Sequence, residues 1–133
     1  MNDKALILVV DDEPGVRQSF NMVLKDDYDV ILSATGAEAV DILKSHAVDL
    51  VLLDILLPDM SGIEILEEIM ETDPDTEVIM VTAVNDVQTA VKAIKLGAYE
   101  YIIKPFIVDE LNRFADCLIP ANKVLPTKST IPI

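Results

Sequence analysis

Short apolar stretches alternate along the chain with longer segments that carry apolar residues at helical spacing. The short stretches are rich in Val, Ile and Leu, which is typical of strands that are buried on both faces of a parallel sheet. The longer segments place apolar residues three or four positions apart, which predicts amphipathic helices. We predict strands at residues 5–10, 30–33, 49–53, 77–81 and 100–103, and helices at residues 14–25, 36–45, 62–70, 87–96 and 108–117.

Residue pairs that favour helix starts lie just after three of the predicted strands. Each pair has a side-chain acceptor followed three residues later by Glu or Gln, which is the capping-box pattern. The pairs are Thr35 with Glu38, Ser61 with Glu64, and Asn85 with Gln88. Together with the alternation of strands and helices, they predict an α/β fold: a doubly wound parallel sheet with helices on both faces.

Polar side chains stand where four of the apolar stretches end. Asp11 and Asp12 follow the first, Asp54 the third, Thr82 the fourth and Lys104 the fifth. Because the carboxyl ends of parallel strands lie along one edge of a sheet, we expect these groups to converge. Three carboxylates, a hydroxyl and an amine suit a divalent cation beside a phosphoryl group. The simpler interpretation is that the acids cap helices or turns and that the lysine is a solvated strand-end residue.

Composition and charge narrow the class of protein. The 133 residues are enough for one domain, and the net charge of −14 argues against direct binding to nucleic acid or to an anionic membrane. No apolar stretch reaches spanning length, and the first residues lack the pattern of a signal peptide. A single cysteine, Cys117, excludes an internal disulfide framework, so we expect a cytoplasmic protein.

Four motifs, in this order, resemble the receiver domain of bacterial two-component response regulators: VVDDEP, LLDILLPDMSG, MVTA and KLGAYEYIIKPF. The resemblance implies a five-stranded (βα)5 flavodoxin-like fold with strand order 2-1-3-4-5, an order that is already known for such domains. Residues 1–118 would form the receiver domain. Residues 119–133, which contain three prolines, would be a linker stub or an extended tail.

The resemblance assigns a metal and a nucleophile to the strand ends. Asp54 would be the phosphoryl acceptor. Mg²⁺ would neutralise the repulsion between this carboxylate and an anionic phosphoryl group. Its protein ligands would be Asp11, Asp12, Asp54 and the backbone carbonyl of Leu56, with Asp11 often acting through water.

Four further residues take roles from the same resemblance. Thr82 would donate its hydroxyl to a phosphoryl oxygen, and Lys104 would aim its ammonium at the same group. The bond before Pro105 would be a cis peptide bond. Tyr101 would move together with Thr82, so that the two residues form a switch between the site and the surface.

The resemblance also implies how the domain would act. It would accept a phosphoryl group from a phosphohistidine on a sensor histidine kinase and then switch an output domain or partner protein, without being a turnover enzyme. The face formed by residues 87–117 would contact that partner or a second copy of the chain. The segment AVKAIKLGAYEYIIKPF further resembles receivers fused to ATPase-type activators that serve an alternative sigma factor, which indicates transcription regulation.

Two other functions fit parts of this pattern. A Mg²⁺-dependent phosphohydrolase also uses an aspartyl nucleophile, but it usually has a second carboxylate two residues later, where this chain has Leu56. A protein-binding module that has the fold without the chemistry would need neither Asp54 nor Lys104. The residues two positions after Asp54 and Thr82 are both apolar, Leu56 and Val84. Neither can orient an attacking water, so we expect slow loss of the phosphoryl group.

Overall fold

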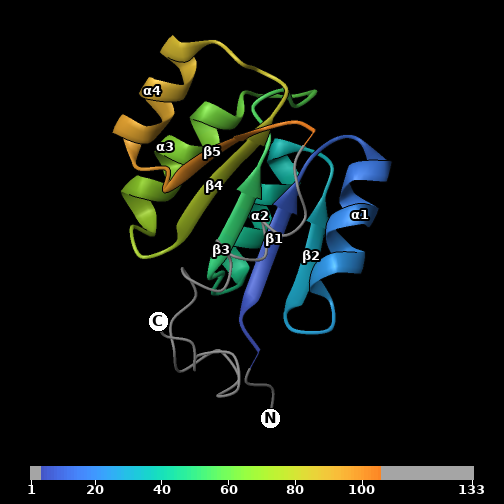
Figure 1. The fold of residues 1–133 in the computed structure, drawn as a ribbon. Coiled ribbons are helices and arrows are strands. Elements are labelled where there is room, and N and C mark those ends of the chain that lie inside the picture. Colours follow the sequence, from blue (N-terminus) through green and yellow to red (C-terminus); the bar gives the residue numbers. More distant parts are fainter. Residues whose placement is uncertain (1–3, 106–133) are drawn as a thin grey trace, which may run out of the picture.

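The computed structural model describes residues 4–105 of the chain (Figure 1). Its elements in order are β1 (Leu6–Val10), α1 (Pro14–Leu24), β2 (Asp29–Ser33), α2 (Gly36–Ser45), β3 (Leu50–Leu53), α3 (Gly62–Thr72), β4 (Glu77–Thr82), α4 (Val87–Leu96) and β5 (Glu100–Ile103). The predicted bounds of α2, α4 and β5 coincide with these, and the others differ by one or two residues at an end. The predicted helix at 108–117 and the expected tail at 119–133 lie outside the described residues.

All five strands run parallel in the order β2-β1-β3-β4-β5, which confirms the predicted doubly wound topology (Figure 1). The register places the last residues of neighbouring strands at similar heights. Val10 at the end of β1 pairs with Leu53 at the end of β3. Asp11 and Asp54 are therefore the first residues beyond two adjacent strands, and both emerge at the same edge of the sheet. The carboxyl ends of β4 and β5 reach this edge as well, because Thr82 pairs with Ile103.

Helices cover both faces of the sheet, and the apolar runs of the strands are buried between them. Successive residues of β1 alternate between two clusters: Ile7 and Val9 pack with residues of α1, whereas Leu8 and Val10 pack with residues of α2, α3 and α4. Because both faces are covered, every residue of β3 is buried. Within residues 4–105, no helix is long and apolar enough to cross a bilayer.

Two of the three predicted capping boxes form in whole or in part. At α3, Ser61 accepts from the amide of Ile63, and the Glu64 carboxylate accepts from the Ser61 amide, which completes the box. At α2, Thr35 accepts from the amide of Glu38 as predicted. The Glu38 carboxylate, however, accepts from the amide of the residue before Thr35.

The third predicted capping box, Asn85 with Gln88, is wrong. The N-cap of α4 is Asp86, whose carboxylate accepts from the Thr89 amide at 2.9 Å and from the Thr89 hydroxyl at 2.6 Å. A carboxylate is a stronger acceptor than an amide oxygen and interacts favourably with the positive end of the helix dipole. The helix therefore begins at Val87, directly after the charged residue.

Candidate metal and phosphoryl site

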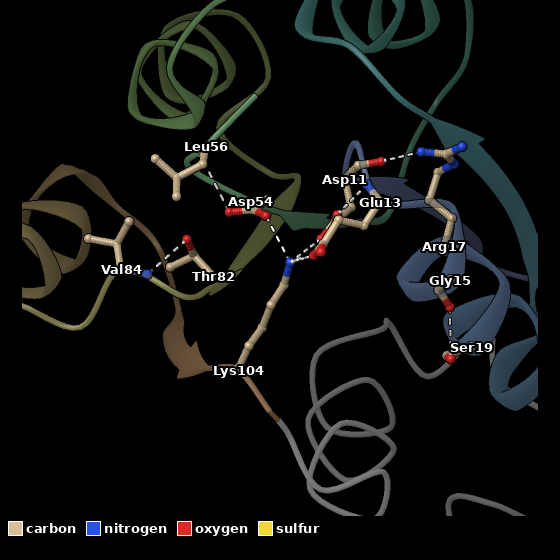
Figure 2. Close-up of polar contacts among 10 residues, drawn as sticks. All are labelled: Asp11, Glu13, Gly15, Arg17, Ser19, Asp54, Leu56, Thr82, Val84 and Lys104. Carbon is tan, nitrogen blue, oxygen red and sulfur yellow. Dashed lines mark hydrogen bonds and ion pairs between the residues drawn. The ribbon is translucent and has the colours of Figure 1, made fainter. Parts of the chain in front are cut away.

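Polar groups predicted from the sequence meet at the carboxyl edge of the sheet. Carboxylate oxygens of Asp11, Asp12 and Asp54 all lie within 4.8 Å of one another. The Lys104 ammonium extends between the other groups, with Nζ 2.7 Å from Asp11 Oδ2 and 2.9 Å from Asp54 Oδ2 (Figure 2). Figure 2 also shows Thr82 beside Asp54. These side chains come from the ends of four different elements, so only the folded sheet can assemble them.

The central ion pairs of this cluster are almost removed from solvent. The side chains of Lys104, Asp11 and Asp54 are 13%, 2% and 5% exposed, whereas Asp12 is exposed at the rim. Buried charges are tolerated only when they are paired or hydrogen-bonded. One ammonium here compensates two buried carboxylates, so the cluster retains an excess of negative charge that can attract a cation.

Backbone amides orient both buried carboxylates. Asp54 Oδ1 accepts from the amide of Leu56 at 3.1 Å, and Asp11 Oδ1 accepts from the amide of Glu13 at 2.9 Å. Each donor lies two residues after its acceptor, so the chain turns immediately after the strand. The other oxygen of each carboxylate, Oδ2, is left to face Lys104. The two acids are thus held in similar orientations by local turns.

Gly62 allows the loop after β3 to close tightly behind Asp54. A Cβ atom at this position would lie 2.1 Å from the Asp54 carbonyl oxygen, so no larger residue fits without moving the backbone. The Gly62 amide donates to the carbonyl of Ile55 at 2.9 Å. This close approach brings the first turn of α3 directly against the residue that follows β3.

The pKa values of the two buried acids, Asp11 and Asp54, are shifted in opposite directions. Burial alone would raise the pKa of Asp54, but the Thr82 hydroxyl, the Lys104 ammonium and the Leu56 amide outweigh burial and lower it. Burial raises the pKa of Asp11 despite the bonds from Lys104 and the Glu13 amide, and the nearby Asp54 charge adds to the rise. Burial also disfavours the charged lysine, yet its hydrogen bonds to the acids raise its pKa. Asp54 is therefore the more readily ionised of the two buried acids.

These residues fit a Mg²⁺ ion. Mg²⁺ prefers carboxylate, carbonyl and water oxygens, and this cluster offers carboxylates from three residues. Asp12 lies at the solvent side, which leaves room for the waters that Mg²⁺ retains. Leu56, the fourth predicted ligand, lies in the loop after Asp54 with its side chain exposed.

The two predicted switch residues are connected through a third residue, Val84. Thr82 is fully buried, and its Oγ1 accepts from the amide of Val84 at 3.3 Å (Figure 2). The hydroxyl of Tyr101, a half-buried side chain, donates to the carbonyl of Val84 at 2.8 Å. Burial also raises the pKa of this phenol. The peptide bond between Lys104 and Pro105 is cis, the isomer that the resemblance implied.

Two polar residues near the site were not predicted from the sequence. Glu13 accepts from the Lys104 ammonium at 3.1 Å, and Arg17 donates to the backbone carbonyl of Asp11 at 2.7 Å (Figure 2). A signal for Glu13 was available, because it directly follows the two strand-end acids. Arg17 lies one turn into α1, where a long side chain can reach back to the strand end, although nothing in the pattern singles it out.

Comparison with known proteins gives a consistent result. The family model described as response regulator receiver domain matches residues 7–116. Sporulation initiation phosphotransferase F of Bacillus subtilis (strain 168) is 38% identical over 130 residues, covering 97% of this chain and 98% of that protein. Regulatory protein AtoC of Escherichia coli (strain K12) is 39% identical over 107 residues, which are 80% of this chain but only 23% of AtoC.

Solved structures extend the likeness to three dimensions. The beryllofluoride-activated NtrC4 receiver domain dimer, a solution structure, has a TM-score of 0.82 at 36% identity, covering 86% of this chain and 95% of that one. The BeF3-activated DrrB receiver domain has the same TM-score at 32% identity, covering 86% and 97%. The structural similarity to these receiver domains therefore extends over most of the described residues.

Proposed function

The chain belongs to the response regulator receiver domain family, and on this premise we propose that Asp54 accepts a phosphoryl group from a sensor histidine kinase. Receiver domains are the signalling domains of two-component systems and are not turnover enzymes. One observation carries the proposal: the Asp54 carboxylate is buried within reach of two further carboxylates and in contact with the Lys104 ammonium. This is the arrangement that an aspartyl nucleophile needs when it meets an anionic phosphorus centre.

The transfer step follows from the state of the acceptor. A lowered pKa keeps Asp54 ionised at neutral pH, so a carboxylate oxygen has a lone pair ready to attack. The new bond joins this oxygen to phosphorus, and the bond from phosphorus to the donor imidazole nitrogen breaks, with its electrons passing to the ring. Lys104, which now contacts Asp54, would transfer its hydrogen bond to a phosphoryl oxygen. Catalysis is mainly positioning and neutralisation of charge.

We assign the metal to Asp11, Asp12, Asp54 and the backbone carbonyl of Leu56. When bound, Mg²⁺ supplies positive charge that lets two anionic groups approach each other. The residues of the chain hold the acids ready for the ion: the Leu56 and Glu13 amides each fix one oxygen of a carboxylate, and the other oxygen, which contacts Lys104, has a further lone pair for the ion.

Val84 provides the path from the site to the surface. If the Thr82 hydroxyl turns to a phosphoryl oxygen, it gives up its bond with the Val84 amide. The loop between β4 and α4 is then free to shift, and the hydrogen bond from the Tyr101 hydroxyl to the Val84 carbonyl changes with it. Val84 lies in the loop before α4, and Tyr101 lies in β5. A change of charge at Asp54 would therefore alter the surface that α4 and β5 form.

The surface receiving this signal is the face formed by residues 87–117, as far as it is described. Exposed apolar side chains line α4 and β5, among them Val87, Val91, Ile94 and Ile103. Such a patch suits an output domain, a partner protein or a second copy of the chain. A similar solved structure is a receiver domain dimer, which supports dimerisation, and one relative is the regulatory protein AtoC, which supports a role in regulation.

The alternative activities have less support. A phosphohydrolase would need a general acid two residues after the nucleophile, and the residue there is the exposed, apolar Leu56. A protein-binding module that is not phosphorylated would not require the ion pair between Asp54 and Lys104.

Intact-mass measurement after incubation with acetyl phosphate tests the proposal. We expect a single phosphate adduct on the wild-type chain when Mg²⁺ is present, and none when a chelator is added. Asp54→Asn should take up no phosphate, whereas Asp75→Asn, which changes an exposed acid before β4, should behave as wild type. Absence of an adduct on the wild type with Mg²⁺ would contradict the proposal.

A further inference from the structure

The loop between β3 and α3 is attached to a different helix by one of its own carboxylates. Asp59 Oδ1 accepts from the amide of Gly36 at 2.8 Å, and Oδ2 accepts from the amide of Ala37 at 2.9 Å. Both donors belong to the first turn of α2. The neighbouring Met60 side chain packs against the same helix start, where a Cβ atom on Gly36 would lie 2.3 Å from Met60 Cγ. The loop tip is thus held by a polar and an apolar contact.

The helix already has its own cap, so these contacts do more than begin α2. Thr35 accepts from the Glu38 amide in the usual local manner. The first two amides of an exposed helix start are commonly satisfied by water. Asp59 reaches them from more than twenty residues further along the chain. By contrast, Asp86 caps α4 entirely from within its own turn. The long-range carboxylate therefore constrains the loop from which it comes.

The other end of this loop is the candidate metal site. Leu56 donates its amide to Asp54, and it also forms an isolated bridge with Ser61. Gly62 closes the loop by donating to the Ile55 carbonyl. Leu56 therefore lies on a short segment held at its base by these bonds and at its tip by Asp59. A segment fixed at both ends keeps its backbone carbonyls in place without further ordering.

We propose that Asp59 is a positioning residue for the metal site: by fastening the loop tip to α2, it fixes the Leu56 backbone and sets the affinity of the site for Mg²⁺. The inference rests on the proposed function, in which Leu56 and the acids of the strand ends bind this ion. Groups that orient metal ligands commonly contribute about tenfold or more to affinity. Asp59 would act through the loop and would not touch the ion.

Titration calorimetry of Mg²⁺ into the unphosphorylated full chain tests this role. Asp59→Ala should weaken binding by about tenfold, a loss typical of removing a group that orients a ligand. Asp59→Asn retains an oxygen that can accept one bond, so its affinity should lie between those of Asp59→Ala and wild type. The matched control is Asp86→Ala, which removes an exposed capping carboxylate from another helix and should bind Mg²⁺ as wild type does.

A second readout separates loop positioning from simple helix capping. Amide hydrogen exchange should become faster at Leu56 and Ser61 in Asp59→Ala, and should remain unchanged at these positions in Asp86→Ala. Equal Mg²⁺ affinity in wild type and both Asp59 variants would overturn the inference. Absence of Mg²⁺ binding by the wild type would instead refute the proposed function. If Asp59→Ala does not fold, the milder Asp59→Asn decides the result.

Discussion

At the scale of single residues, Lys104 is the charge on which the site depends. It is the cation that compensates two buried carboxylates, and it also contacts the exposed Glu13. The contacts with Asp11 and Asp54 are largely shielded from water, whereas the contact with Glu13 is open to it. Loss of the two buried contacts should therefore change the free energy of unfolding more than loss of the contact with Glu13.

Replacing Lys104 with methionine should destabilise the fold as well as impair phosphorylation. Removal of one partner from a buried ion pair typically costs about 3 kcal/mol, because the remaining charge is left without compensation. We expect this loss in the free energy of unfolding at pH 7, measured by urea denaturation. The control Lys92→Met changes an exposed lysine of α4 and should stay within about 0.5 kcal/mol of wild type. Equal stability of the two variants would contradict the ion-pair account.

Asp11→Asn should have the opposite effect on stability. The raised pKa of Asp11 means that folding disfavours its charged form, so the acid costs stability at every pH above its folded pKa. That cost decreases as pH falls and vanishes below the unfolded pKa, where the group is protonated in both states. The variant should therefore be more stable than wild type at pH 7 and converge with it in acid, as measured by denaturation across pH. A stability gap that widens towards low pH would disprove the assignment.

Leu56→Asn should shorten the lifetime of the phosphorylated state. The wild-type side chain is exposed and apolar, so it cannot hold a water in line with phosphorus. An amide at this position can donate to or accept from that water. Loss of phosphate, followed by intact mass after removal of the phosphodonor, should be faster in the variant. A variant that loses phosphate more slowly than wild type would reject this explanation.

At the scale of elements, α3, the helix that follows the loop after β3, begins with a complete capping box. The Ser61 hydroxyl accepts from the Ile63 amide, and the Glu64 carboxylate accepts from the Ser61 amide. Gly62 packs against the Asp54 carbonyl. α3 therefore begins at a defined place relative to Asp54.

Ser61→Ala should lower the free energy of unfolding by about 1 kcal/mol, the usual cost of losing an N-cap side chain. Thermal denaturation gives the comparison. Ser19→Ala is a suitable control because Ser19 is exposed within α1 and its hydroxyl donates to the carbonyl of Gly15, one turn earlier. A loss at Ser61 no greater than that at Ser19 would show that the cap does not support the helix.

Several elements were predictable because their signals are local. The apolar runs of β1, β3 and β4 reflect burial on both faces, and their order follows from the resemblance. The start of α4 was predicted, but its cap was assigned to Asn85, because two neighbouring residues compete as caps and the charged Asp86 is the stronger acceptor. The contacts of Arg17 and Asp59 connect separate elements, so no local pattern could reveal them.

At the scale of the whole molecule, the parallel sheet collects chemistry from distant parts of the sequence at one edge. Parallel pairing and matched strand ends place Asp11 and Asp54 side by side. The same frame also holds α4 and β5, where apolar side chains meet solvent. The described residues thus hold a charged site and the proposed partner surface on one sheet.

Addition of beryllofluoride and Mg²⁺, which together mimic the phosphorylated state, should increase self-association. Sedimentation velocity should show a shift from monomer to dimer for the wild type. Val91→Glu places a charge on the exposed apolar face and should stay monomeric, whereas Met22→Glu, on the exposed surface of α1, should dimerise. Dimerisation of both variants would show that the interface lies on another surface.

The identity of the phosphorylated residue is the most direct test of the account. After phosphorylation with Mg²⁺ present, borohydride reduction converts an aspartyl phosphate to homoserine, which peptide mass spectrometry can locate. Phosphoryl transfer to Asp54 predicts homoserine at residue 54 and at no other position. Homoserine at Asp11 or Asp12, or none in a chain that carries a phosphate adduct, would contradict it.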